Sequence, residues 1–211
     1  MSYRSSTSSH PQKPWSLAPS APAASPLSAS ASSSYYHQHP SARPPSCNIS
    51  EIIPRLYISD LAFVENPALL ASYRITHILS ATSDTVFRPS PSQLPTQPVR
   101  LHIRVEDLPF AELAAHLPTT TSFIRDALNS RPDARIVVHC AEGISRSVSV
   151  VAAFLMAAYG WAPMDAVTYI KGKRRVANPN FGFVQQLHEY ARNELGRSIP
   201  TPVPPRYPPA S

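Results

Sequence analysis

The chain has 211 residues, a net charge of +6, 25 prolines and two cysteines. Two cysteines exclude a disulfide framework, so we expect a reducing compartment such as the cytoplasm or the nucleus. The positive charge favours anionic partners. No basic run is interleaved with aromatic residues, however, so the sequence does not predict nucleic-acid binding.

Composition divides the chain into three parts. Residues 1–46 are mostly Ser, Pro and Ala. Such a segment buries too little apolar surface to offset the entropy lost on ordering, so we predict a disordered tail. Residues 198–211 form a Pro-rich C-terminal tail, which could dock on a proline-recognition domain. Residues 47–197 suffice for one domain with its own core.

Strand-like and helix-like segments alternate from residue 52 onward. A strand is expected at Ile52–Ile58, where Pro54 indicates an edge or a bend, and a loop over 83–98. The other predicted strands are Ile75–Leu79, Val99–Val105 and Arg135–His139, and the predicted helices are Ala68–Tyr73, 111–129, Val148–Tyr159, Met164–Arg174 and 181–195. This alternation predicts an α/β fold with a mostly parallel central sheet flanked by helices on both faces.

One uncharged run, Ser147–Met164, approaches the length of a membrane span. It contains Gly160 and Pro163, and it follows a polar loop directly. We therefore interpret it as a helix buried in the core and expect no membrane span. The N-terminus lacks the continuous apolar segment of a secretory signal.

The segment from His139 to Ser147, HCAEGISRS, carries the chemistry of this chain. It joins a predicted strand to a predicted helix, so the backbone N–H groups of a tight loop and a helix N-terminus create a positive potential there. Arg146 can bind two oxygens of one phosphate with its planar guanidinium. The same potential favours a thiolate, so the pKa of Cys140 should be depressed. The segment therefore predicts a nucleophile at the bottom of a phosphate-binding loop.

With five residues between Cys140 and Arg146, the segment resembles the His-Cys-x5-Arg-Ser/Thr signature of cysteine-dependent phosphatases. The inner Gly-x-Ser-Arg-Ser is similar to the dual-specificity branch, and the whole resembles its atypical members over about 51–195. The resemblance implies a protein-tyrosine-phosphatase-like fold of the dual-specificity type. It also implies a phosphocysteine intermediate on Cys140. Substrate phosphate would be bound by Ala141, Glu142, Gly143, Ile144, Ser145 and Arg146.

Cleavage of a phosphate monoester also needs a proton for the leaving oxygen. Asp107 matches the position of the family's general acid, 33 residues before Cys140. The same residue, once ionised, would activate water in the second step. Glu106 is the runner-up, and a helix cap or a solvated loop acid is the structural alternative for Asp107. The remaining acids considered are Asp84, Asp126 and Glu142.

Four further residues are expected to support the site. The Ser147 hydroxyl can donate to the thiolate and ease its departure in the second step, and it can equally satisfy helix N–H groups. His139 would support the thiolate within the loop or be a satisfied core histidine. Ser145 is expected to shape the loop. Asn180 lies in a Pro-Asn element before the last predicted helix, where it would tether the loop or cap the helix.

Charged residues in and near the loop indicate how highly charged a substrate the site can bind. The Glu142 side chain should point to solvent because the loop amides point inward. The loop has no lysine at positions 141, 142 and 144, which disfavours a highly charged inositol phosphate. We interpret the basic run Lys171–Arg175 as a solvated helix end rather than a nuclear import signal.

The sequence therefore predicts a protein phosphatase acting on phosphotyrosine and on phosphoserine or phosphothreonine, with phosphoproteins as partners. We expect no cofactor, and histidines without ligand spacing predict no metal. One alternative is a phosphatase of a non-protein phosphate, such as a phosphoinositide, an RNA 5′ end or a phosphoglucan. Another is a non-catalytic phospho-binding scaffold, against which Cys140 and Arg146 both argue. The physiological substrate, the oligomeric state and a disulfide between Cys47 and Cys140 stay open.

Overall fold

The computed structural model describes residues 48–94 and 96–196, so Cys47 and both predicted tails lie outside the described residues. The domain limits of 47 and 197 stay predictions. The strands are β1 (Ile49–Ile53), β2 (Leu56–Ser59), β3 (His77–Ala81), β4 (Val99–Ile103) and β5 (Ile136–His139). The helices are α1 (Leu61–Glu65), α2 (Pro67–Ser72), the 3₁₀ helix η1 (Ala114–His116), α3 (Leu117–Ser130), α4 (Arg146–Tyr159), α5 (Pro163–Lys173) and α6 (Phe181–Asn193).

The strands of the described region form one sheet in the order β1-β2-β5-β3-β4. β2, β5, β3 and β4 are parallel, and only β1 pairs antiparallel, with β2. This confirms the predicted mostly parallel sheet. Because parallel strands end at the same edge, the segments that follow β2, β3, β4 and β5 gather there. Ligands of open α/β sheets bind at this carboxyl edge.

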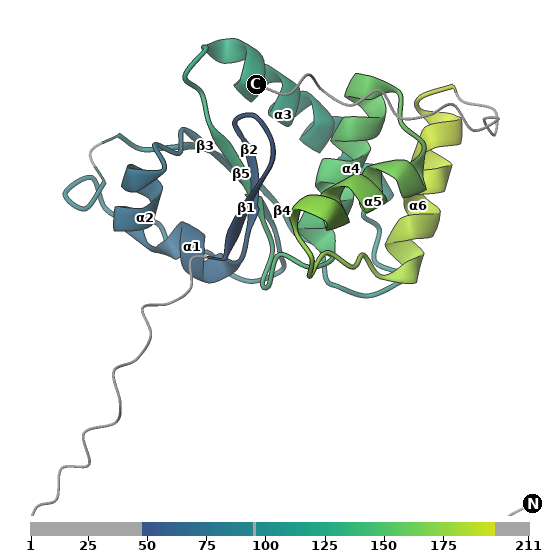
Figure 1. The fold of residues 1–211 in the computed structure, drawn as a ribbon. Helices are drawn as coiled ribbons and strands as arrows, with labels where there is room; N and C mark the ends of the chain where they lie inside the picture. The colour runs from purple at the N-terminus through teal and green to yellow at the C-terminus, as the bar shows by residue number, and fades with distance from the viewer. Residues whose placement is uncertain (1–47, 95, 197–211) are drawn as a thin grey trace, which may run out of the picture. The chain divides into compact units, whose positions relative to one another are not determined.

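Helices cover both faces of the sheet, as predicted (Figure 1). Ile136 and Val138 of β5 belong to the larger core, which includes α3–α6, whereas Val137 between them belongs to the core beneath α1 and α2. Helix α4 lies in the larger core, and 11 of its 14 residues are buried. The interpretation of the uncharged run that begins at Ser147 as a helix buried in the core is therefore confirmed.

The prediction of one strand over Ile52–Ile58 is wrong, but the bend that Pro54 indicated is present. β1 and β2 form a hairpin in this region, and the chain reverses at Pro54 and Arg55. Arg55 has φ 71°, a left-handed conformation that usually favours glycine. Its side chain stabilises the turn, because Arg55 Nη1 donates to the carbonyl of Leu128 at 3.0 Å.

The predicted helix over 111–129 begins later than expected. Residues 114–116 form η1, and α3 starts at Leu117 with Pro118 in its first turn, where a proline is well tolerated. Helix α2 starts as the Asn66–Pro67 pair indicates, since Asn66 Oδ1 accepts from the amides of residues 68 and 69. Helix α1, capped by Asp60, was not predicted as a separate helix.

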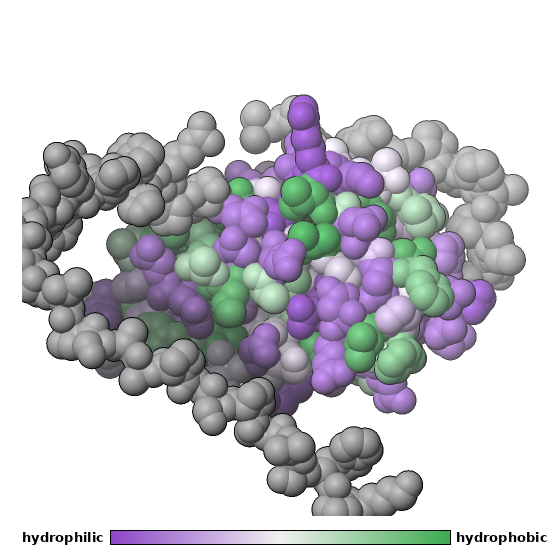
Figure 2. Space-filling view, turned by 90° about the horizontal axis from the view of Figure 1, so that it is seen from below, coloured by the Kyte–Doolittle hydropathy of each residue, from purple (hydrophilic) through white to green (hydrophobic). Residues whose placement is uncertain are grey.

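No single helix within residues 48–94 and 96–196 is long and apolar enough to cross a membrane. Helices α4 and α5 meet that criterion only together, as a pair bent by 118°. Figure 2 shows the molecule from below relative to Figure 1, and its hydrophobic residues form small groups among hydrophilic ones.

Candidate active site

The predicted nucleophile follows the last residue of β5, at the carboxyl edge of the sheet. Cys140 is 1% exposed. The loop that it begins is tied to the segments on either side. Ala141 accepts a hydrogen bond from the amide of Leu61 at 2.9 Å, and Ile144 accepts one from the amide of Asn178 at 2.8 Å. The loop is thus held to the start of α1 and to the segment before α6.

The sulfur of Cys140 is surrounded by hydrogen-bond donors. Gly143 N donates to Sγ at 3.2 Å, and the Ser147 Oγ lies 3.3 Å from Sγ. Burial alone would raise the pKa of Cys140. The hydrogen bonds from Ser147 and Gly143 and the positive charge of Arg146 outweigh burial, so the pKa lies below that of an ordinary thiol. These contacts favour a nucleophilic thiolate.

The loop adopts a shape that requires glycine at one position. Gly143 has φ 70°, and a Cβ placed there would lie 2.5 Å from the carbonyl oxygen of Ser59 and 2.6 Å from a nitrogen of Arg174. A side chain would therefore push the loop away from β2. Glu142 is exposed, which agrees with the orientation expected from the sequence, and Ser145 is buried.

Arg146 is the first residue of α4 and is 8% exposed. Its Nη1 donates to the carbonyl of Val105 at 3.3 Å and to the Thr82 hydroxyl at 3.5 Å. Its Nε is buried, has no hydrogen-bond partner among the described residues, and lies 3.7 Å from Asp107 Oδ2. The guanidinium is therefore held on one side and has a free donor on the side of Asp107.

Asp107, Ser145 and Asn180 form a hydrogen-bonded group beside this arginine. Asp107 Oδ1 accepts from the Ser145 hydroxyl at 2.7 Å and from Asn180 Nδ2 at 2.8 Å. Asn180 also caps α6, because its Oδ1 accepts from the amide of Phe183 at 2.9 Å. Its backbone amide donates to the Ser145 hydroxyl at 3.1 Å. The tether and the helix cap, proposed as alternatives for Asn180, are thus both present.

The other predicted acids lie differently. Glu106 is exposed and makes no hydrogen bond or ion pair within the described residues. Asp84 accepts from the Thr82 hydroxyl at 3.1 Å. Asp126 is exposed on α3. Among these carboxylates, Asp107 alone contacts the phosphate-binding loop through its side chain.

His139 is fully buried at the end of β5. Nδ1 lies 3.1 Å from the Cys140 carbonyl, and Nε2 lies 2.7 Å from the Ser80 hydroxyl. A carbonyl can only accept, so Nδ1 carries the proton and Nε2 accepts from Ser80. Burial lowers the pKa of His139 to about 4, so the ring is neutral near pH 7. It supports the loop through hydrogen bonds rather than charge.

One residue that contacts the loop was not anticipated. Arg174 is 3% exposed, so its assignment to a solvated helix end is wrong. Its Nε donates to the carbonyl of Gly143 at 2.7 Å, and its Nη2 donates to that of Glu142 at 3.1 Å. Arg174 thus holds the outer side of the loop. Its neighbours in a basic run gave no signal that this one cation is buried.

No group of three or more His, Cys, Asp or Glu side chains that could hold a metal ion occurs in the part of the chain that the structure describes. The donors around Cys140 are amides, hydroxyls and a guanidinium, which suit an anion. The site residues thus offer no ligand set for a cation.

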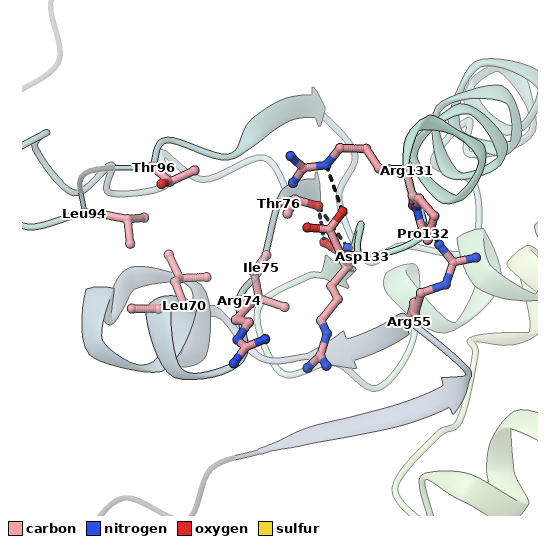
Figure 3. Close-up of a pocket in the computed structure, with 12 residues that line it drawn as sticks. Arg55, Leu70, Arg74, Ile75, Thr76, Leu94, Thr96, Arg131, Pro132 and Asp133 are labelled. Atoms are coloured by element: carbon pink, nitrogen blue, oxygen red, sulfur yellow. Dashed lines mark hydrogen bonds and ion pairs between the residues drawn. The ribbon is translucent and has the colours of Figure 1, made fainter. Parts of the chain in front are cut away.

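One cavity lies away from these residues. It has a volume of about 430 Å³. Thr76, which precedes β3, lines it (Figure 3), and so does Arg135, which precedes β5. Arg131 and Asp133 form an ion pair of 3.2 Å at this cavity. None of the predicted site residues lines it. The candidate active site lies at the opposite edge of the sheet, after the carboxyl end of β5.

Comparison with known proteins agrees with this geometry. The family described as "Dual specificity phosphatase, catalytic domain" matches residues 56–193. Dual specificity protein phosphatase 1 of Arabidopsis thaliana is 35% identical over 147 residues, which cover 69% of this chain and 71% of that protein. Dual specificity protein phosphatase 13B of Mus musculus is 32% identical, with 71% and 77% covered.

Solved structures show the same fold. The human tyrosine phosphatase-like serine/threonine/tyrosine-interacting protein superposes with a TM-score of 0.62 at 30% identity, over 70% of this chain and 97% of that one. The Yvh1 phosphatase domain of Chaetomium thermophilum superposes with a TM-score of 0.63 at 28% identity, covering 70% and 96%. The chain therefore belongs to the dual-specificity phosphatase family of phosphoester hydrolases.

Proposed function

We propose that the chain hydrolyses phosphotyrosine and phosphoserine or phosphothreonine in proteins, with Cys140 as nucleophile and Asp107 as general acid and base. The observation that carries this proposal is the environment of the sulfur. A buried Cys140 accepts from the Gly143 amide, contacts the Ser147 hydroxyl and has a lowered pKa. A structural thiol needs none of these features.

In the first step, the thiolate of Cys140 attacks phosphorus while the bond from phosphorus to the ester oxygen breaks. The free Nε of Arg146 and the loop amides of residues 141–146 bind the equatorial oxygens, where charge is concentrated. Asp107, held next to Arg146, protonates the leaving oxygen. The products are the dephosphorylated hydroxyl and a phosphocysteine.

In the second step, water attacks the phosphocysteine and the bond from phosphorus to sulfur breaks. Asp107, now ionised, accepts the proton of this water. The thiolate is the leaving group, and a hydrogen bond from the Ser147 hydroxyl stabilises the charge that returns to sulfur. Phosphate is released and the enzyme returns to its starting state.

Phosphoproteins are the substrates that the relatives' names support, since these are dual specificity protein phosphatases. The phosphate-binding loop lacks lysine, which argues against inositol phosphates. A thiolate nucleophile also needs reducing conditions, so we place the enzyme in the cytoplasm or the nucleus. The tails, for which docking on proline-recognition domains was predicted, lie outside the described residues.

The test compares wild type with Cys140→Ser for hydrolysis of p-nitrophenyl phosphate, followed by phosphopeptides of all three kinds. We expect the variant to be inactive while it still binds phosphopeptides. Wild type quenched in acid during turnover should carry phosphate on Cys140 alone. Equal rates for the two proteins would exclude this mechanism. Turnover of phosphoinositides or RNA 5′ ends at rates above those for phosphopeptides would reassign the substrate.

A further inference from the structure

A small basic cavity lies near the active site and takes no part in the mechanism above. It has a volume of about 160 Å³. Residues of β3 and β4, the residue after β4 and the loop after β3 line it, among them Ser80, Thr85, Arg88, Arg100, His102 and Arg104. Three of these residues are arginines and no lining residue is acidic, so positive potential is concentrated in a confined space.

The register of the sheet explains why these side chains meet. Arg100 and His102 are two residues apart on β4, so they point to the same face. Ser80 is the partner of His102 on β3, and Ile78 is the partner of Arg100. Ile78 belongs to the core beneath α1 and α2, so the cavity opens on that face of the sheet. The regular pairing of β3 and β4 thus brings Ser80, Arg100 and His102 together along one side of the cavity.

One donor in the cavity lacks an acceptor. Arg100 Nη2 is buried and has no hydrogen-bond partner among the described residues. Burial and the positive charge of Arg88 both lower the pKa of Arg100, which shows that the two guanidinium groups repel each other there. Buried polar groups in native proteins nearly always find a partner, so an unpaired one points to a bound water or ion.

The acidic side chains around this loop are engaged elsewhere. Asp84 accepts from the Thr82 hydroxyl at 3.1 Å, and Glu65 accepts from the amide of Phe87 at 2.9 Å. Within the described residues, no carboxylate forms an ion pair with Arg88, Arg100 or Arg104. An anion from solution would pair with these arginines and accept the free N–H group.

We propose that this cavity binds a tetrahedral oxyanion of the phosphate class. Its volume equals that of about five water molecules, which accommodates a phosphoryl group but not a nucleoside. Arg100 and Arg88 donate to the oxyanion, and Arg104 adds positive charge at the rim. The ligand is either a second phosphoryl group of the substrate or free phosphate.

Two hydrogen bonds link the cavity to the active site. Ser80 lines the cavity and donates to His139, which directly precedes the nucleophile. Thr82 lies three residues before Thr85 in the same loop and accepts from Arg146. An anion in the cavity would therefore order the loop after β3, which contains Thr82 and contacts Arg146 through it. This inference goes beyond the proposed function, because binding in the cavity does not require turnover.

The binding test is titration of isotopically labelled full-length protein with inorganic phosphate, followed by amide chemical shifts. We expect two separate sets of shifts, one at residues 141–146 and one at residues 85–88 and 100–104. Arg100→Gln should weaken binding at the second set about tenfold to a hundredfold and leave the first set unchanged. Arg88→Gln, on the exposed loop, should do the same even if Arg100→Gln fails to fold. Arg192→Gln, an exposed arginine of α6, is the matched control.

Kinetics then separates the two sources of the anion. If the ligand is a second phosphoryl group, Arg88→Gln lowers kcat/KM for a doubly phosphorylated peptide and not for its singly phosphorylated form. If the ligand is free phosphate, Arg88→Gln changes kcat/KM for the doubly and the singly phosphorylated peptide by the same factor. Phosphate shifts confined to residues 141–146 in wild type would overturn the proposal, even in a fully active enzyme. An effect of Arg192→Gln as large as that of Arg88→Gln would also overturn it.

Discussion

Replacing Ser147 with alanine should raise the pKa of Cys140 by about one to two units. The Ser147 hydroxyl lies 3.3 Å from the sulfur and Ser147 is 0% exposed, so water cannot easily take its place. A hydrogen bond to a charged group stabilises it by about 1.5–3 kcal/mol. One pKa unit corresponds to about 1.4 kcal/mol, which gives the stated shift. The Gly143 amide and Arg146 stay in place, so the pKa should not rise to the value that burial alone would produce.

The assay is the pH dependence of Cys140 alkylation by iodoacetamide, in a Cys47→Ser background. Ser149→Ala is the matched control, because Ser149 is equally buried on α4 but donates to the Ser145 carbonyl at 3.0 Å rather than to the sulfur. The same Ser147→Ala protein should accumulate phosphocysteine, since its thiolate leaves less readily in the second step. An unchanged pKa in Ser147→Ala, or an equal rise in Ser149→Ala, would refute the reasoning.

Three other substitutions test separate parts of the site. Asp107→Asn should lower kcat on phenyl phosphate by about 10²–10⁴, whereas Glu106→Gln should stay near wild type; the reverse result would identify Glu106 as the acid. Gly143→Ala forces a side chain into a left-handed position against β2, so thermal unfolding should show a loss of about 1–3 kcal/mol together with lost activity; an unchanged Tm would contradict the loop geometry. Because the pKa of His139 falls from 6.5 to about 4 on folding, the unfolded chain binds more protons between these pH values, and stability should rise by about 3 kcal/mol from pH 4 to 6.5. Urea unfolding should show this rise in wild type and in the exposed His188→Gln control but not in His139→Gln, and an equal rise in all three would exclude His139 as its source.

The candidate phosphate-binding loop could be recognised from sequence because its residues are adjacent in the chain. Between His139 and Ser147, one short segment contains the predicted nucleophile, the glycine with positive φ and the arginine, and the apolar runs on either side indicate the strand and the helix. The parallel sheet followed from alternating periodicities. The hairpin of β1 and β2 was missed because the turn uses Arg55 in a left-handed conformation, where sequence reasoning expects glycine or asparagine.

The contact between Asp107 and Asn180 could be anticipated only in part. Each residue was singled out, yet they are 73 positions apart in sequence, and no spacing rule predicts that Nδ2 of one bonds Oδ1 of the other. Gly182 lies against the backbone of Pro109, so a larger residue there would separate the two segments. This close approach of the chain after β4 to the start of α6 is a property of the packed structure.

Arg174 provides hydrogen-bond donors for carbonyl groups of the loop. When loop amides point toward a phosphate, the carbonyls of the same peptides point away from it and need donors behind the loop. Arg174 supplies those donors to residues 142 and 143, some 31 positions away in sequence. Burial lowers the pKa of Arg174, whereas the negative charges of Asp60 and the Cys140 thiolate act in the opposite direction. Two arginines thus lie at the loop with different partners: Arg174 binds its carbonyls, and Arg146 binds residues 82 and 105. In the proposed mechanism, Arg146 binds the substrate phosphate, and Arg174 fixes the carbonyls so that the amides would keep an inward orientation before substrate binds.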